Sequence, residues 1–376
     1  MYEVTTKEYA GLLRKCEKVK QPLFVQGSFG IGKSAIPRQV FKEIAAERKL
    51  KFIEWSDLSL EEKEHAINNP GQYYAFMDAR TSQMDTTSLQ GIPNMSRTDR
   101  LENIPYSWVV FFTQPKAHGA LFFDEINLAA PIVQSITYSA IHDRVVSDRR
   151  LSDDIFVFAA GNRQKDRAHT FDMPMPLRDR FAECEVRIDG DAWMDWARSV
   201  GVNPHLISFI AWKPSYLDKT GSSNADKPST PRGVHRASNL IKGHDLNSES
   251  DTVHQLVSIS CGQAFATEFE AYVKCFRQLN WNKIFKTPSS VGEFKMDMQY
   301  AVAGGLADIY QQSPDDEKKL GSIIDVVVEL KPEMAVHTLR MMRDINSDRF
   351  GKSLRNIKRG ADIANRYAKF IIDGAS

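Results

Sequence analysis

The segment Gly27-Ser28-Phe29-Gly30-Ile31-Gly32-Lys33-Ser34 fits the pattern G-x-x-x-x-G-K-[ST] at every position. An apolar stretch at 22–26 precedes it, and residues 33–48 repeat apolar positions at helical spacing. A strand, a glycine-rich turn and a helix in this order let backbone N–H groups and a helix N-terminus face one phosphate group. We expect residues 27–34, with Ala35, to surround the phosphates, Lys33 to reach the β and γ phosphates, and Ser34 to ligate magnesium. The sequence therefore predicts a nucleoside triphosphate site.

Two adjacent carboxylates, Asp124 and Glu125, follow directly after the apolar run 120–123. A solvated strand end is the alternative interpretation. In a chain with a phosphate loop, however, the first acid of such a pair holds magnesium, usually through water, and the second polarises an attacking water. A glutamate directly after Asp124 favours hydrolysis over transfer to a small-molecule acceptor.

A second apolar run, 155–160, ends in Gly161-Asn162. Taken alone, this dipeptide is a turn signal. As the third motif after the phosphate loop and the acidic pair, Asn162 is expected to lie between them and to orient a water beside the γ-phosphate.

The chain alternates strands and helices in its first half and is helical afterwards. Apolar strand-like runs occupy 22–26, 52–55, 73–78, 107–112, 119–124 and 153–160, with helical stretches at 33–48 and 58–68. Strands that alternate with helices predict a mainly parallel sheet covered on both faces. Downstream of about 188 the helical segments are 261–279, 298–311, 323–330 and 335–345. We therefore expect an α/β domain at 1–187 and an all-helical domain with a helical tail at 188–376.

Composition excludes several classes of protein. The 376 residues are 42% hydrophobic and 26% charged, which is ordinary for a globular chain. Lys plus Arg number 49 and Asp plus Glu 48, so bulk charge does not favour nucleic acid or an anionic membrane. The longest apolar runs are too short to span a bilayer. The start of the chain shows a helix-capping pair, Thr5 and Glu8, rather than a signal peptide, and the four cysteines show no metal spacing. We expect a cytoplasmic protein.

The motifs GSFGIGKS, ALFFDEINLA, FVFAAGN, MPLRDRF and PSTPR, in this order, resemble those of the AAA+ ATPases. The segment 78–93 before the acidic strand resembles their MoxR-like, dynein-related branch. The resemblance covers roughly residues 20–275. It implies an AAA+ P-loop NTPase fold, with a parallel-sheet core and an all-helical C-terminal lid domain, and the cofactors ATP and Mg²⁺.

The resemblance also assigns roles to arginines. The family's arginine finger lies in a segment ending Asp-Arg-Phe, here 179–181, which makes Arg180 the expected finger and Arg178 the alternative. Such a guanidinium stabilises charge on a neighbour's γ-phosphate. The family's second sensor follows a proline at the start of a lid helix, which points to Arg232, with Arg236 one turn later. A hairpin expected within 140–153 carries Arg144, Arg149 and Arg150, which could touch a partner or face solvent.

These inferences predict an ATPase that hydrolyses Mg-ATP at subunit interfaces, in a ring that is expected to be a hexamer, and remodels a partner protein. The family often works with a von Willebrand factor A domain, which here would be a separate polypeptide. The alternatives are a DNA-directed AAA+ motor, against which the near-neutral charge weighs, and a scaffold that assembles on ATP and hydrolyses it slowly, against which Glu125 weighs. A small-molecule kinase would need neither Asn162 nor Arg232.

Overall fold

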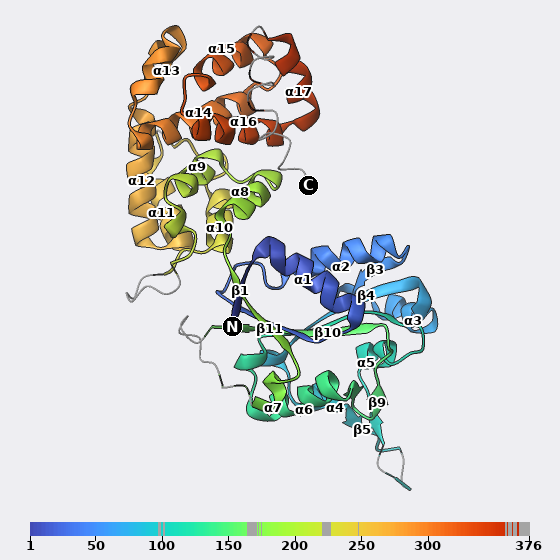
Figure 1. Cartoon of the computed structure of the whole chain (residues 1–376). Helices are drawn as coiled ribbons and strands as arrows, with labels where there is room; N and C mark the ends of the chain where they lie inside the picture. Colours follow the sequence, from blue (N-terminus) through green and yellow to red (C-terminus); the bar gives the residue numbers. More distant parts are fainter. Residues whose placement is uncertain are drawn as a thin grey trace. The chain divides into compact units, whose positions relative to one another are not determined.

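The computed structural model describes residues 1–96, 99–100, 102–163, 171, 173, 175–219, 227–246, 248–357, 359, 363 and 367. The chain forms two compact units, Met1–Ile188 and Asp189–Ser376. Figure 1 shows strands in the first unit and helices throughout the second. No helix in the described ranges is long and apolar enough to cross a membrane.

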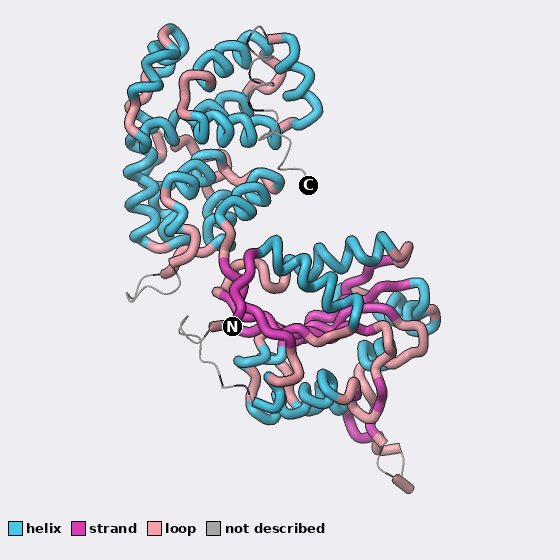
Figure 2. Tube along the Cα trace, in the orientation of Figure 1, coloured by secondary structure: helices cyan, strands magenta, loops and turns pink. Residues whose placement is uncertain are grey.

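A parallel sheet is the centre of the first unit. Among the described residues it has seven strands in the order β1-β11-β2-β10-β7-β4-β3, and every neighbouring pair is parallel. Its strands are β1 (Tyr2–Thr5), β2 (Leu23–Gly27), β3 (Lys51–Glu54), β4 (Tyr73–Arg80), β7 (His118–Asp124), β10 (Ile155–Asn162) and β11 (Ala182–Arg187). Because all strands run the same way, their carboxyl ends share one side of the sheet. Figure 2 shows these strands at the centre of the first unit with helices on both sides.

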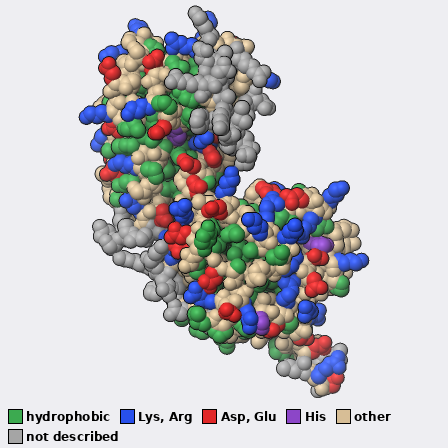
Figure 3. Space-filling model, in the orientation of Figure 1, with side chains coloured by type: hydrophobic (Ala, Val, Ile, Leu, Met, Phe, Trp, Pro, Cys, Tyr) green, Lys and Arg blue, Asp and Glu red, His purple; other side chains and the backbone are tan. Residues whose placement is uncertain are grey.

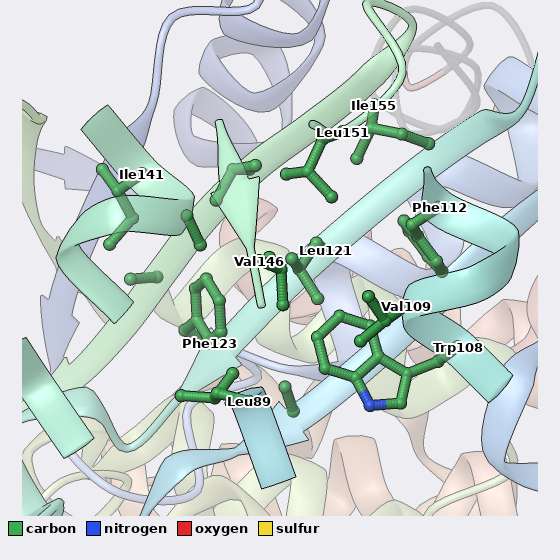
Figure 4. Close-up of a cluster of buried hydrophobic side chains, with 14 of the residues drawn as sticks. Leu89, Trp108, Val109, Phe112, Leu121, Phe123, Ile141, Val146, Leu151 and Ile155 are labelled. Carbon is green, nitrogen blue, oxygen red and sulfur yellow. The ribbon is translucent and has the colours of Figure 1, made fainter. Parts of the chain in front are cut away.

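Helices cover both faces of the sheet, because the central strands are apolar on both sides. One face carries α1 (Thr6–Val19) and α2 (Ala35–Glu47), whose Tyr9 and Phe41 pack with Phe122 and Phe158. The other face carries α3 (Leu60–Asn68), α4 (Thr86–Gln90), α5 (Ser107–Phe112), α6 (Pro131–His142) and α7 (Met175–Arg178). Figure 4 shows this second core, where Leu121 and Phe123 of β7 meet Trp108 and Phe112 of α5.

Two small hairpins and several 3-10 turns complete the first unit. Strand β5 (Ile92–Pro93) pairs with β6 (Asn103–Ile104), and β8 (Val145–Val146) pairs with β9 (Arg149–Arg150), both antiparallel. The hairpin predicted within 140–153 is therefore confirmed. Among the described residues of the chain, the 3-10 turns are Trp55–Asp57, Pro70–Gln72, Thr81–Gln83, Ile126–Leu128, Pro214–Tyr216 and Pro288–Glu293.

The described part of the second unit contains helices joined by loops and turns, and no strand. Its helices are α8 (Gly190–Ser199), α9 (Pro204–Trp212), α10 (Pro231–Leu240), α11 (Ser250–Cys261), α12 (Gln263–Arg277), α13 (Trp281–Lys286), α14 (Met296–Gln312), α15 (Glu317–Val327), α16 (Pro332–Ile345) and α17 (Ser347–Asn356). Phe209 of α9 contacts the rings of Phe265, Phe269 and Tyr272 on α12, which forms an aromatic core. The predicted fold class, a parallel-sheet α/β core with a phosphate-loop motif and an all-helical C-terminal part, is confirmed.

One predicted strand is wrong. The run 107–112 forms helix α5, in which Trp108, Val109, Phe111 and Phe112 are buried. These positions are spaced as one face of a helix, and an unbroken apolar run of this length fits a buried strand equally well. Tertiary packing decides the outcome, since the run lies over the sheet and not within it.

Two strands of the sheet were not predicted. In β11 only Cys184 and Val186 are buried among polar neighbours, which is the period-two pattern of a strand near a sheet edge. In β1 only Val4 is buried, because this short strand is itself the edge. The helix after it is confirmed, with Thr5 and Glu8 forming the capping box.

Candidate functional site

The candidate site lies at the carboxyl edge of the sheet, where β2, β10, β7 and β4 end. Asn162 pairs with Gly27 at the ends of β10 and β2, and Asp124 pairs with Arg80 at the ends of β7 and β4. Ligands bind outside the carboxyl ends of strands in open parallel sheets. The strand order places β10, which ends in Asn162, between β2, which leads into the loop, and β7, which ends in Asp124.

The loop positions 27, 30 and 32 favour glycine for different structural reasons. Gly30 and Gly32 have φ of 78° and 98°, in the region that favours glycine. A Cβ on Gly27 would lie 2.5 Å from Cδ1 of Ile31 and 3.0 Å from the Val186 carbonyl oxygen, so a larger residue would force Ile31 and the end of β11 to shift. Backbone N–H groups of Ala35 and Ile36 bond to the carbonyl of Gly32, which starts helix α2 within the motif.

Lys33 is 9% exposed, and its ammonium lies inside the loop. Nζ donates to the carbonyl oxygens of Gly27 at 2.7 Å and Ser28 at 2.9 Å, and to Oδ1 of Asn162 at 3.0 Å. The charge is thus held where β2 ends, next to the end of β10. This is the position from which an ammonium can meet a phosphate bound by the loop.

Ser34 and Asp124 contact each other directly. Oγ of Ser34 donates to Oδ2 of Asp124 at 2.6 Å, and the Asp124 side chain is largely buried. Thr81 donates from Oγ1 to the Asp124 carbonyl at 2.7 Å, and this contact fixes the strand end. A hydroxyl and a carboxylate oxygen at one point form a hard-oxygen donor set that fits Mg²⁺.

Glu125 occupies an unusual backbone position. Its φ is 57°, in the left-handed region that a glutamate rarely adopts. Oγ of Ser82 donates a short hydrogen bond to its Oε2. Strain of this kind persists only where surrounding structure fixes it, and it gathers at functional sites. The carboxylate is partly exposed, so a substrate water could reach it.

Asn162 is fixed by Asn127, which follows the acidic pair. Nδ2 of Asn127 donates to the Asn162 carbonyl at 2.7 Å, and the Asn162 N–H donates to Oδ1 of Asn127 at 3.0 Å. A Cβ on Gly161 would lie 2.8 Å from that Oδ1, so this close approach requires glycine. The side chain of Asn162 remains directed at Lys33.

Two further groups around the site were not predicted from the sequence. Arg163 donates a short hydrogen bond to Oγ of Ser28 and pairs with Glu185 at 3.4 Å. Arg38 on α2 donates to Glu54 at 3.0 Å, to Oδ2 of Asp78 at 2.6 Å and to the Ser34 carbonyl at 3.5 Å. Arg163 directly follows Asn162, and Arg38 comes one helical turn after Ser34. Their closeness in sequence to the predicted motifs is the feature that could have indicated them.

Asp78 has the most unusual environment of the acids at this edge. Burial raises the pKa of its carboxyl, the charge of Asp124 raises it further, and the Arg38 guanidinium lowers it. Oδ1 of Asp78 is buried and has no hydrogen-bond partner in the described part of the chain.

Arg178 and Arg180 lie at the opposite edge of the sheet. They precede β11, whose first residue Ala182 pairs with Leu23 at the start of β2, and Gln21 donates to the Arg180 carbonyl at 3.3 Å. The loop begins at Gly27, four residues along β2, or roughly 13 Å at the usual rise of a strand. The structure therefore does not bring these arginines to the phosphate loop of their own chain.

The two arginines differ in their contacts. Arg178 makes a bidentate pair with Glu183, with Nε and NH2 at 2.9 and 2.7 Å from its oxygens. The Arg180 side chain is 42% exposed and lies 4.0 Å from the Asp179 carboxylate, and a side-chain hydrogen bond with Tyr138 raises the pKa of its guanidinium. Arg178 is thus held within the chain, whereas Arg180 is the more available for another molecule.

The remaining predicted arginines belong to the second unit and to the β8–β9 hairpin. Arg232 is exposed at the second residue of α10, two residues after the N-cap Thr230, and Arg236 donates to the Ser260 carbonyl at 3.1 Å. On the β8–β9 hairpin Arg149 and Arg150 are exposed. Arg144 instead donates to the carbonyls of Ser152 at 2.6 Å and Ile155 at 2.8 Å and has a structural role.

Comparisons with known proteins find distant structural resemblance. No protein-family model matches the sequence, and the search of curated proteins finds no significant match. Among solved structures, NtrX from Brucella abortus in complex with ATP is 10% identical, with a TM-score of 0.35, over 92% of this chain and 69% of that chain. The RuvB Holliday junction branch migration motor from Thermotoga maritima is 11% identical, with a TM-score of 0.25, over 88% and 85%. PCH-2 from C. elegans is 14% identical, with a TM-score of 0.27, over 72% and 67%. Scores of this size describe a remote likeness of shape and do not indicate a function.

Proposed function

We propose that this chain is an AAA+ ATPase that binds and hydrolyses Mg-ATP at the carboxyl edge of its sheet. The observation that carries the proposal is a pair of contacts between segments far apart in sequence. Lys33 bonds to Asn162, and Ser34 bonds to Asp124. A phosphate loop, a magnesium-binding acid and a polar sensor thus meet at one point, with Glu125 next to them.

Each side chain has a role in hydrolysis under this proposal. The loop N–H groups and Lys33 bind the phosphates, and Ser34 and Asp124 hold Mg²⁺, which neutralises charge on the β and γ oxygens when it is bound. Glu125 accepts a proton from the water that attacks the γ phosphorus, while the bond to the β–γ bridging oxygen breaks. Asn162 orients this water beside Lys33.

The sheet geometry supports a site completed by a second subunit. Arg180 is exposed and lies at the edge away from its own loop. A finger arginine at that place acts on a neighbour's γ-phosphate, which requires an assembly in which subunits follow one another head to tail. We propose a ring, with six subunits as the family resemblance implies, and Arg232 as the second sensor.

The finer assignment rests on sequence resemblance. Residues 78–93 resemble the MoxR-like branch, whose members remodel or assemble partner proteins. A partner with a von Willebrand factor A domain on a separate polypeptide fits that branch. Basic and acidic side chains are intermixed on the face seen in Figure 3, which favours a protein partner over DNA.

The proposal is tested by turnover, assembly and capture. We expect magnesium-dependent release of phosphate from ATP, a larger assembly by mass photometry with ATP than without it, and retention of a specific protein by the Glu125→Gln variant in ATP. Absence of ATP binding would reject the site itself. Salt-sensitive DNA binding that stimulates turnover would favour the DNA motor, and ATP-driven assembly with negligible turnover would favour the scaffold.

A further inference from the structure

A third carboxylate lies beside the proposed magnesium site. Asp78 belongs to β4, whose neighbour β7 ends in Asp124. Its side chain is 8% exposed. A buried carboxylate normally uses both oxygens in hydrogen bonds or ion pairs. Asp78 uses Oδ2 toward Arg38, while Oδ1 is buried without a partner in the described part of the chain.

The register of the sheet places Asp78 and Asp124 on the same face. Asp78 pairs with Phe122, and side chains two apart along a strand share a face, so Asp124 follows Phe122 on that side. This is the face covered by α2, because Phe76 and Phe122 pack with Phe41 of that helix. Ser34 lies at the N-terminus of α2 and bonds to Asp124.

Arg38 connects Asp78 to the same helix turn. It donates to the Ser34 carbonyl at 3.5 Å and to Oδ2 of Asp78 at 2.6 Å, and Glu54 accepts a further bond at 3.0 Å. The Arg38 guanidinium thus bridges Asp78 and Ser34, the residue that would ligate magnesium. The positive charge keeps the carboxylate in place without occupying Oδ1.

Building on the proposed function, we propose that Oδ1 of Asp78 accepts a hydrogen bond from a water on the magnesium ion of the nucleotide complex. Mg²⁺ retains several waters in such sites, and a carboxylate nearby can hold one of them. Asp78 then belongs to the metal site together with Ser34 and Asp124, although it does not ligate the metal directly. Partners of this kind change metal affinity by about 10–100-fold.

The experiment measures metal binding directly, with Mn²⁺ as the probe. Free Mn²⁺ is measured by electron paramagnetic resonance during titration of the full chain with the non-hydrolysable analogue AMP-PNP. We expect Asp78→Asn, which keeps the size of the side chain, to weaken Mn²⁺ binding about tenfold or more. Affinity for AMP-PNP in EDTA should not fall. An unchanged Mn²⁺ dissociation constant would overturn the inference.

Two control variants separate a metal role from a role in holding Arg38. Glu54→Gln removes the other carboxylate bound to Arg38, and Arg38→Gln removes the guanidinium while keeping Asp78. We expect Glu54→Gln to bind Mn²⁺ nearly as wild type does, and Arg38→Gln, which removes the ion pair that holds Asp78, to weaken Mn²⁺ binding less than Asp78→Asn does. If Arg38→Gln weakens Mn²⁺ as much as Asp78→Asn, then Asp78 acts only by holding Arg38 and the inference is wrong.

The outcome also distinguishes this inference from the proposed function. If the wild-type chain binds neither AMP-PNP nor Mn²⁺, the nucleotide site itself is rejected. If the wild type binds both and Asp78→Asn is unchanged, only the role of Asp78 is rejected. Should Asp78→Asn fail to fold, as judged by circular dichroism, the pair Arg38→Gln/Asp78→Asn removes both charges together and is compared with Arg38→Gln alone.

Discussion

The ammonium of Lys33 donates a hydrogen bond to the amide oxygen of Asn162 across 3.0 Å, which joins the phosphate loop to the end of β10. The two residues are far apart in sequence and meet because β2 and β10 are neighbouring strands with Gly27 opposite Asn162. The ammonium of the loop and the amide at the end of β10 are thus in direct contact.

Substitution of Lys33 should abolish ATP binding, whereas substitution of Asn162 should slow ATP turnover. Lys33→Ala removes the charge at the β and γ phosphates, so we expect no ATP binding by isothermal titration calorimetry. Asn162→Ala should retain binding and lose about 10² in turnover, as expected when a group that orients or stabilises the reacting atoms is removed. Lys42→Ala, on the exposed side of the same helix α2, is the control. An unchanged ATP affinity in Lys33→Ala would contradict the loop assignment.

Glu125→Gln should separate binding from chemistry. The substitution keeps the size of the side chain and removes the carboxylate that we propose takes the proton from water. We expect ATP affinity to stay within error and turnover to fall by about 10² or more, measured as phosphate release. Glu64→Gln, an exposed glutamate on α3, should change neither quantity. Turnover close to wild type would mean that another group activates the water.

Gly161→Ala should destabilise the first unit through the sensor strand. The added Cβ would lie 2.8 Å from Oδ1 of Asn127 and 3.1 Å from Cζ of Phe24. Overpacking of this kind costs about 1–3 kcal/mol of unfolding free energy. Gly11→Ala in α1, where a Cβ meets nothing within 4 Å, should instead stabilise by roughly 0.5–1 kcal/mol. Urea unfolding of both variants measures the contrast, and equal stability for the two would show that Asn127 moves aside.

The helical unit should lose stability below neutral pH. Burial lowers the pKa of His205 to about 4, and burial together with Arg198 and Arg340 lowers the pKa of His337 to about 3. Both imidazoles are neutral in the folded chain near pH 7 and titrate near pH 6.5 in the unfolded chain. Their contribution to the free energy of unfolding is therefore complete above pH 6.5 and is lost as the pH falls toward their folded pKa values. By linkage, each histidine lowers the free energy of unfolding by about 2 kcal/mol at pH 5.

Hydrogen exchange of the α9 and α16 backbone amides measures this loss of stability at low pH within the helical unit. His205→Gln should show a smaller loss of protection between pH 7 and pH 5 than wild type. If the variant and the wild type lose the same protection, the acid sensitivity comes from other groups.

Much of the candidate site was predictable because its motifs are local. The segment 27–34 carries its own loop and helix start, and Asp124 and Asn162 follow apolar runs that fit buried strands. Parallel strands then bring these ends to one edge whatever the rest of the chain does. The run 107–112 shows where this reasoning stops, since an apolar segment this short fits a helix or a strand until its neighbours are known.

Contacts that depend on register were not predictable. Asp78 meets Arg38 only because β4 pairs with β7 in one register and α2 lies over that face. The bond from Ser82 to Glu125 depends on the turn after β4, and the pair between Asn127 and Asn162 depends on the turn after β7. None of these residue pairs has a spacing in sequence that would have indicated it.

The position of Arg180 predicts rescue between two inactive variants. Arg180→Ala keeps its phosphate loop and loses the exposed guanidinium, so it should bind ATP and hydrolyse it about 10³-fold more slowly. Lys33→Ala should not bind ATP in its own phosphate loop, but it keeps an intact Arg180. Mixed subunits form interfaces where the intact loop of the first variant meets the intact arginine of the second, and these should recover turnover.

The rescue experiment requires subunits that exchange, which a differently tagged pair demonstrates by co-purification. Arg178→Ala is the matched comparison, because Arg178 is held by Glu183 in its own chain. Its mixture with Lys33→Ala should show no gain beyond what Arg178→Ala gives alone. Exchange without rescue by the Arg180→Ala mixture would reject Arg180 as an arginine that acts between subunits. Rescue confined to the Arg178→Ala mixture would transfer that role to Arg178, whose pair with Glu183 would then have to open on assembly.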